Sequence, residues 1–177
     1  MNKAMLMLIP LLSLWGCGDA EETTASKSGD KSAAGAGGAS GSAAGPVASG
    51  PVKIEQLGLT IDAPGDAVVK DAIGGNGVQI QGGDLFVHVG LPGKFDKATL
   101  TEVIEEEKSS KSAENLVPEE LDDGWALSFT NTGGLGTNYW VDVRRTFGDV
   151  TYRCDTSAST QAQQDAALAA CKSLRKE

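Results

Sequence analysis

Few residues of this 177-residue chain have side chains that could carry out chemistry together. The candidates are one histidine, His88, and three cysteines, Cys17, Cys154 and Cys171. Redox pairs and thiolate metal sites are typically built from closely spaced cysteines, and the chain contains no C-x-x-C. It also contains no G-x-S-x-G run, which would present a nucleophilic serine at a strained turn. We therefore predict no catalytic residue, no metal site and no cofactor.

His88 alternates along its segment with Val87 and Val89, so we expect it on the opposite face of a strand from these two residues. We interpret it as a surface or inter-helix histidine. The functional alternative is the base of a Ser-His-Asp triad, whose other members the sequence does not reveal.

Carboxylates gather near one turn of the chain: Glu119, Glu120, Asp122 and Asp123. Oxygen ligands of this kind could hold calcium, but they lack the D-x-D-x-D-G spacing that places successive oxygens around one ion. We interpret them as side chains of a hairpin turn, with a weak ion site as the alternative.

Cys17 ends the run Leu14-Trp15-Gly16-Cys17, which follows the apolar stretch Ala4–Leu14 behind a single basic residue, Lys3. A charged head, a short apolar core and a small residue before a cysteine together resemble the lipobox signal of bacterial lipoproteins. The resemblance implies that residues 1–16 are a signal peptide and that Cys17 is lipidated. The alternatives are an ordinary secretory signal or a membrane anchor, although a spanning helix needs about 20 apolar residues.

The residues after Cys17 bear on where the lipid is inserted. Gly18 follows the cysteine, where lipoproteins retained in the inner membrane often carry Asp, so we expect the outer membrane instead. Residues 17–50 contain no aromatic residue and consist mostly of Gly, Ala, Ser, Thr and charged residues. Such a segment cannot bury enough apolar surface to fold, so it is predicted to be a disordered tether.

The composition limits the classes of partner. The formal net charge is −9, and a protein that binds nucleic acid needs a basic patch to neutralise phosphates. We therefore expect no nucleic-acid partner. Binding to the membrane is expected through the lipid on Cys17.

With Cys17 lipidated, the two other cysteines remain in an oxidising compartment. Cys154 ends a strand-like run, Val150–Cys154, and Cys171 lies in a helix-like run, Ala162–Arg175. We predict a structural disulfide between them that ties the C-terminal helix to the last strand. A closed loop of this size contributes about 3 kcal/mol in the chain-entropy model.

Residues 51–177 are predicted to form a single domain. Short β-prone runs lie over 58–64, 68–72, 78–81 and 85–90, separated by glycine-rich turns. A helix that Asp96 or Thr99 could cap is expected to end near 109–112, and a meander of strands then leads to the C-terminal helix. The predicted fold class is α+β, an antiparallel sheet packed with two helices.

Trp140 is the candidate interaction anchor. Alternation places Val141 and Val143 on the face covered by the C-terminal helix, and Trp140 with Asp142 and Arg144 on the other face. A large aromatic residue on a polar sheet face can anchor a partner. The alternative is that another segment, such as the N-terminal strands, covers it.

The order of these elements is similar to the small α/β/α sandwich domains of the Mog1/PsbP-like type, which occur in many bacterial lipoproteins. The similar features are Pro64-Gly65 after the first strands, Thr99-Leu100 at the start of the first helix, Gly124-Trp125, and Cys171-Lys-Ser-Leu174 at the end of the last helix. The resemblance implies the architecture. It implies no enzymatic function, because that fold has no common catalytic site.

The sequence thus favours a membrane-tethered, non-enzymatic module that binds a protein or another component of the cell envelope. The first alternative is a small-molecule-binding domain or accessory subunit with its ligand between sheet and helix. A hydrolase is the least supported hypothesis.

Overall fold

The structure is a computed structural model that describes residues 49–177. The predicted signal peptide, Cys17 and the predicted tether up to residue 48 lie outside the described residues. The first described strand starts at Ser49.

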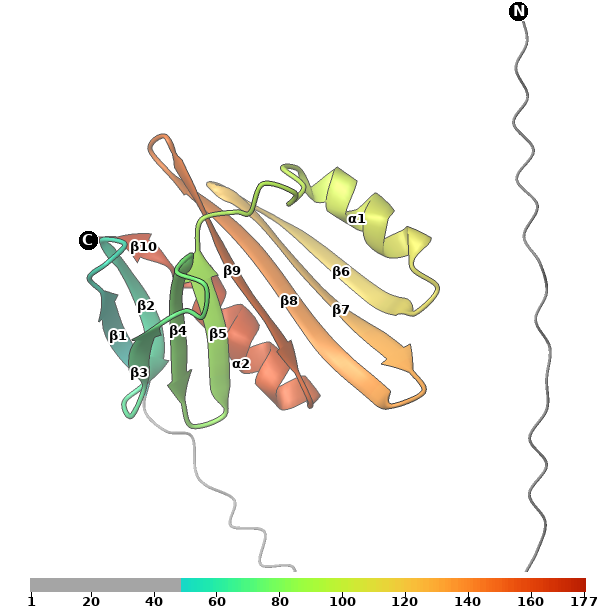
Figure 1. The fold of residues 1–177 in the computed structure, drawn as a ribbon, viewed down its shortest axis with the longest axis horizontal. Coiled ribbons are helices and arrows are strands. Elements are labelled where there is room, and N and C mark those ends of the chain that lie inside the picture. Colours follow the sequence, from blue (N-terminus) through green and yellow to red (C-terminus); the bar gives the residue numbers. More distant parts are fainter. Residues whose placement is uncertain (1–48) are drawn as a thin grey trace, which may run out of the picture. The chain divides into compact units, whose positions relative to one another are not determined.

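All the paired strands of the described range are antiparallel, and they form two sheets (Figure 1). The small sheet has the order β1 (Ser49–Ile54), β2 (Leu59–Pro64) and β10 (Arg175–Lys176). The large sheet has the order β3 (Val68–Asp71), β4 (Gly77–Gly82), β5 (Leu85–Gly90), β9 (Val150–Ala158), β8 (Gly136–Phe147), β7 (Gly124–Gly133) and β6 (Ala113–Leu121). With two helices, α1 (Leu100–Ser109) and α2 (Gln161–Lys172), this confirms the predicted α+β class.

Thr99, not Asp96, caps α1. The Thr99 Oγ1 accepts a hydrogen bond from the Glu102 backbone N–H at 3.3 Å, and the Glu102 carboxylate accepts one from the Thr99 N–H at 3.1 Å. This reciprocal capping box satisfies two N–H groups that a helix start leaves unpaired. Neither α1 nor α2 is long and apolar enough to cross a membrane.

The C-terminal helix is shorter than predicted. It ends at Lys172, because Arg175 and Lys176 pair with Thr60 and Leu59 of β2 as strand β10. The strand that carries Cys154 is therefore the last strand of the large sheet but not the last of the chain.

The two helices lie on opposite faces of the large sheet (Figure 1). Alternate residues of β7 show this: Ala126 belongs to the cluster that contains Ala167 and Ala170 of α2, whereas Trp125 and Leu127 belong to the cluster that contains α1. Side chains of a strand alternate between faces, so one strand serves two cores. The small sheet contributes to the α2 core.

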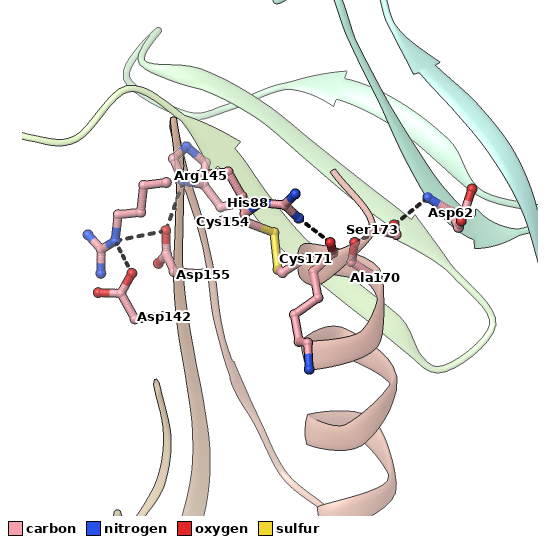
Figure 2. The surroundings of a disulfide bond; sticks show 11 residues. Asp62, His88, Asp142, Arg145, Cys154, Asp155, Ala170, Cys171 and Ser173 are labelled. Atoms are coloured by element: carbon pink, nitrogen blue, oxygen red, sulfur yellow. Dashed lines mark hydrogen bonds and ion pairs between the residues drawn. A yellow bond between two sulfur atoms is a disulfide. The ribbon is translucent and has the colours of Figure 1, made fainter. Parts of the chain in front are cut away.

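The predicted disulfide joins Cys154 of β9 to Cys171 of α2, with their Cα atoms 5.5 Å apart. Both residues have no exposed surface. Figure 2 shows the bond linking the strand to the last turn of the helix. This confirms the disulfide and the face of β9 on which α2 packs.

Candidate functional site

The face of the large sheet opposite α2 is only partly covered, since α1 packs over β6 and β7. We call its remaining part, over β5, β9 and β8, the open face. Strand register assigns to it the side chains of Phe86, His88, Asp155, Ser157, Trp140 and Asp142, together with those of Arg144 and Arg153. This is the candidate site, because the chain presents both aromatic and charged groups there.

Trp140 lies on the open face, as its alternation predicted, and 37% of its surface is exposed. Its ring stacks on that of Phe129, with the ring centroids 6.1 Å apart and the planes 7° from parallel. From the other side of the sheet, the buried Gln164 of α2 donates hydrogen bonds to the Phe129 and Trp140 carbonyl oxygens, at 3.0 and 2.8 Å. The Phe129 ring thus packs against the Trp140 ring and Gln164 bonds to the Trp140 backbone, while part of Trp140 stays exposed.

A network of ion pairs lies beside Trp140 on the same face. Arg153 is its centre: its guanidinium lies 3.2 Å from a carboxylate oxygen of Asp96 and 3.3 Å from those of Asp142 and Asp155. Arg144 joins the network at 3.4 Å from both Asp96 and Asp142. Asp96, which the sequence suggested as a helix cap, instead connects the loop before α1 to the sheet.

Arg144 is the most enclosed member of the network, with 4% of its side chain exposed. Its guanidinium carbon lies 5.4 Å from the centroid of the Trp125 ring, within the range of a cation–π contact. Its Nε is buried without a hydrogen-bond partner in the described structure. Arg144 therefore joins the charged part of the open face to the core under α1.

The two aspartates that hold the arginines have opposite pKa shifts. Burial raises the pKa of Asp142 above its ordinary value, although the charges of Arg153 and Arg144 oppose the shift. Burial also acts to raise the pKa of Asp96, but a hydrogen bond from the Gly93 N–H and the charges of both arginines outweigh it and hold that pKa below its ordinary value. Burial therefore dominates the pKa of Asp142, whereas the hydrogen bond and the charges of the arginines dominate the pKa of Asp96.

His88 lies on the face opposite Val87 and Val89, as predicted, but it is not a free surface residue. Its Nδ1 lies 3.2 Å from a carboxylate oxygen of Asp155, and 30% of its side chain is exposed. Within residues 49–177, His88 has no serine, threonine or cysteine hydrogen-bond partner. Asp155 also contacts Arg153, so the pair belongs to the ion network.

The acidic turn pairs with basic side chains of other elements. The Asp123 carboxylate accepts hydrogen bonds of 2.6 and 2.8 Å from Arg145, which also donates to the Lys172 carbonyl oxygen at the end of α2. Glu119 accepts from the Lys172 ammonium at 2.6 Å. In the described part of the chain, no group of three or more His, Cys, Asp or Glu residues could hold a metal ion.

Sequence reasoning missed a split in the large sheet. The ladder between β5 and β9 pairs three residues and ends at His88 and Asp155, although both strands continue (Figure 1). A pocket of about 210 Å³ lies at the split, lined by Phe86 of β5 and Ser157 of β9 among others. The alternation of Phe86 with Leu85 and Val87 could have placed it beside His88, but no sequence signal marked the end of the ladder.

Among known proteins, the similarities found are to solved structures. No family model matches the chain, and no curated protein matches it. The solution structure of cyanobacterial PsbP (CyanoP) from Synechocystis sp. PCC 6803 is similar to it, with a TM-score of 0.47 and 13% sequence identity. The match covers 76% of this chain and 96% of that one. PsbP is also part of the name of the family that the sequence resembles. At this similarity we transfer none of that protein's properties to this chain.

Proposed function

We propose that this chain is a lipid-anchored, non-enzymatic binding module of the cell envelope that holds its partner on the open face. The observation that carries the proposal is how the Trp140 side chain is packed and exposed. Its ring stacks on Phe129 and its backbone carbonyl accepts a hydrogen bond from Gln164, yet it remains 37% exposed. Rigid, partly exposed aromatic residues are typical anchors of binding surfaces, because little conformational entropy is lost when they bind.

The charged neighbours of Trp140 support binding rather than catalysis. The carboxylates of Asp142 and Asp155 each contact Arg153, and the His88 ring contacts Asp155. Groups that are already paired can orient a polar partner, whereas a general base must be able to reach the proton it removes.

The anchoring part of the proposal rests on the sequence. The run that ends at Cys17 has the order of a lipobox, and residues 17–50 have the composition of a flexible tether. A lipidated cysteine on such a tether would keep the domain near a membrane without fixing its orientation. We propose the outer membrane because Gly18 follows the cysteine.

The test is cross-linking and pull-down of the full chain in cells, read by mass spectrometry. Three forms are compared: wild type, Cys17→Ser and Trp140→Ala. We expect an envelope component that wild type enriches and that each variant enriches several-fold less. Equal recovery with wild type and Trp140→Ala would refute the open face as the binding surface.

A further inference from the structure

Two loops at one end of the large sheet expose apolar side chains to solvent. The turn between β3 and β4 contains Ile73, and the loop that leads from β5 to α1 contains Leu91 and Phe95. The exposed fractions are 95% for Ile73, 57% for Leu91 and 89% for Phe95. Single exposed apolar residues are normal on protein surfaces, whereas a group of them on neighbouring loops indicates an interaction site.

Strand register places the two loops side by side. The pairs Asp71↔Val78 and Gly77↔Gly90 bring the end of β3, the start of β4 and the end of β5 to the same end of the sheet (Figure 1). The two loops also share a pocket of about 430 Å³, which is lined by Leu57, residues 75–77 and residues 91–94. We call the two loops, residues 72–76 and 91–98, the loop end.

The ion network fixes the loop that carries Phe95. The Asp96 carboxylate accepts a hydrogen bond of 2.9 Å from the Gly93 N–H, and it lies 3.2 Å from the Arg153 guanidinium and 3.4 Å from that of Arg144. Phe95, the residue before Asp96, is left almost fully exposed. A loop that is already ordered loses little conformational entropy when its exposed side chain binds.

Two exposed lysines flank Phe95. The Lys94 Nζ lies 5.8 Å from the centroid of the Phe95 ring, and Lys97 follows two residues after Phe95. Lysine is depleted at the centre of protein interfaces, whereas apolar side chains with neighbouring lysines are typical of segments that lie in the headgroup region of a bilayer. There the stem of a lysine covers apolar surface while its ammonium reaches the lipid phosphates. The composition of the loop end therefore favours a lipid surface over a protein.

The part of the chain that precedes the described residues leads to the proposed lipid on Cys17. Residues 17–48 separate that lipid from Ser49, and a flexible chain of this length spans about 30 Å. The lipid would keep the domain at a high effective concentration beside a bilayer, so weak insertion of three side chains would be enough to orient it. A bilayer is thus the surface that the loop end meets most often.

The two lysines do not make the loop end basic. Lys97 lines a hollow together with Glu102, Glu105 and Glu106 of α1. Attraction to anionic lipid needs a cluster of basic residues. We therefore expect the burial of apolar side chains to drive the contact, so that zwitterionic lipid is sufficient.

We propose that the loop end inserts Ile73, Leu91 and Phe95 into the headgroup region of the bilayer that holds the lipid anchor. Lys94 and Lys97 bond to lipid phosphates beside them. Contact through this end of the strands leaves the open face free for its partner. This rests on the lipid anchor of the proposed function and adds an orientation of the domain to it.

The test uses the lipidated protein, purified from cells and reconstituted into vesicles of dioleoylphosphatidylcholine. A nitrobenzoxadiazole fluorophore is attached to Asn76→Cys, an exposed position of the loop end. Leu135→Cys is the matched reporter, because Leu135 is fully exposed in the β7–β8 turn at the opposite end of the sheet (Figure 1). We expect lipids with a spin label on the acyl chain to quench the reporter at Asn76 severalfold more strongly than the reporter at Leu135.

Two further variants test the contribution of the side chains. Phe95→Ala should reduce the quenching at Asn76 by about half or more, because the ring supplies much of the apolar surface that is buried. Leu135→Ala should leave this quenching unchanged. Both side chains are exposed, so the urea unfolding midpoints of both variants should equal that of wild type. Addition of anionic dioleoylphosphatidylglycerol should not increase the quenching, and a severalfold increase would refute insertion driven by apolar side chains.

Flotation of the wild-type protein with the vesicles separates the two proposals. If the protein floats but the reporters at Asn76 and Leu135 are quenched equally, or Phe95→Ala has no effect, the loop inference is wrong and the lipid anchor stands. If the wild-type protein does not float, the lipid anchor is wrong. The loop inference then fails with it, because it describes how an anchored domain is oriented.

Discussion

Cys154 and Asp155 are consecutive residues of β9 whose side chains leave the large sheet on opposite faces (Figure 2). Cys154 is bonded to Cys171 in the core under α2, whereas Asp155 contacts His88 and Arg153 on the open face. The covalent link on one face thus holds the strand that presents charged groups on the other. The rigidity of the candidate site depends on the packing behind it.

Loss of the disulfide should destabilise the domain without changing its fold. Replacing both Cys154 and Cys171 by Ala removes a crosslink between residues 17 apart in sequence. The chain-entropy model gives a loss of about 3 kcal/mol in the free energy of unfolding, because the unfolded chain gains freedom. Urea denaturation of wild type with and without reductant measures the same quantity. Free-thiol labelling of both cysteines in the native, unreduced protein would contradict the bond.

Trp140→Ala should cost modest stability. The substitution removes a stacked contact with Phe129 but leaves the buried core intact, so we expect a loss of about 1–2 kcal/mol. Leu127→Ala is the comparison: its side chain is fully buried and lies on the same face, and its loss should cost about 2–5 kcal/mol. Chemical denaturation of wild type and both variants measures these losses in the free energy of unfolding. A loss for Trp140→Ala as large as that for Leu127→Ala would identify Trp140 as a core residue.

The ion network predicts an unusual pH dependence at Asp142. Its pKa is raised by burial above the ordinary 3.8, so the native state keeps this proton to higher pH than the unfolded state does. The corresponding stability is present below pH 3.8 and is lost as the pH rises through the raised pKa. The free energy of unfolding of wild type minus that of Asp142→Asn should therefore decrease as the pH rises above about 4.

Asp96→Asn is the matched control for this experiment, because the pKa of Asp96 is lowered. Its stabilising contribution is present above the ordinary value of 3.8 and is lost as the pH falls through the lowered pKa. The wild-type-minus-variant difference should accordingly rise with pH. Glu107 of α1, whose pKa is raised by burial and by the charges of Glu106 and Asp142, is present in wild type and in both variants. If the wild-type-minus-variant difference changed with pH in the same direction for both variants, the opposite pKa shifts of Asp142 and Asp96 would be refuted.

Cys17→Ser should abolish stable membrane association. A lipoprotein cysteine carries two or three acyl chains, and more than one chain is needed for a stable anchor. Fractionation of cells should move the variant out of the membrane pellet, and incorporation of labelled palmitate should be lost. Labelling that persists in Cys17→Ser would show that the lipid, if any, is attached elsewhere.

The sequence by itself determined the features that depend on local pattern. Alternation in the meander predicted that Trp140, Asp142 and Arg144 share a face, because successive side chains of a strand point in opposite directions. The hairpin strands, the two helices and the spacing of Cys154 and Cys171 also follow from short-range patterns. Each of these features depends on residues that are close together in the sequence, so the sequence of that segment is enough to predict it.

The contacts between segments that are distant in the sequence could be seen only in the tertiary structure. The sequence did not show that Trp125 and Leu127 face α1 while Ala126 faces α2, since both faces of β7 are apolar. Nor did it show that Asp96 joins Arg153, or that the ladder between β5 and β9 ends at His88. Such contacts depend on how helices and strands pack against each other, and no local periodicity encodes that packing. The candidate site lies at these contacts, which is why it became visible only in the folded chain.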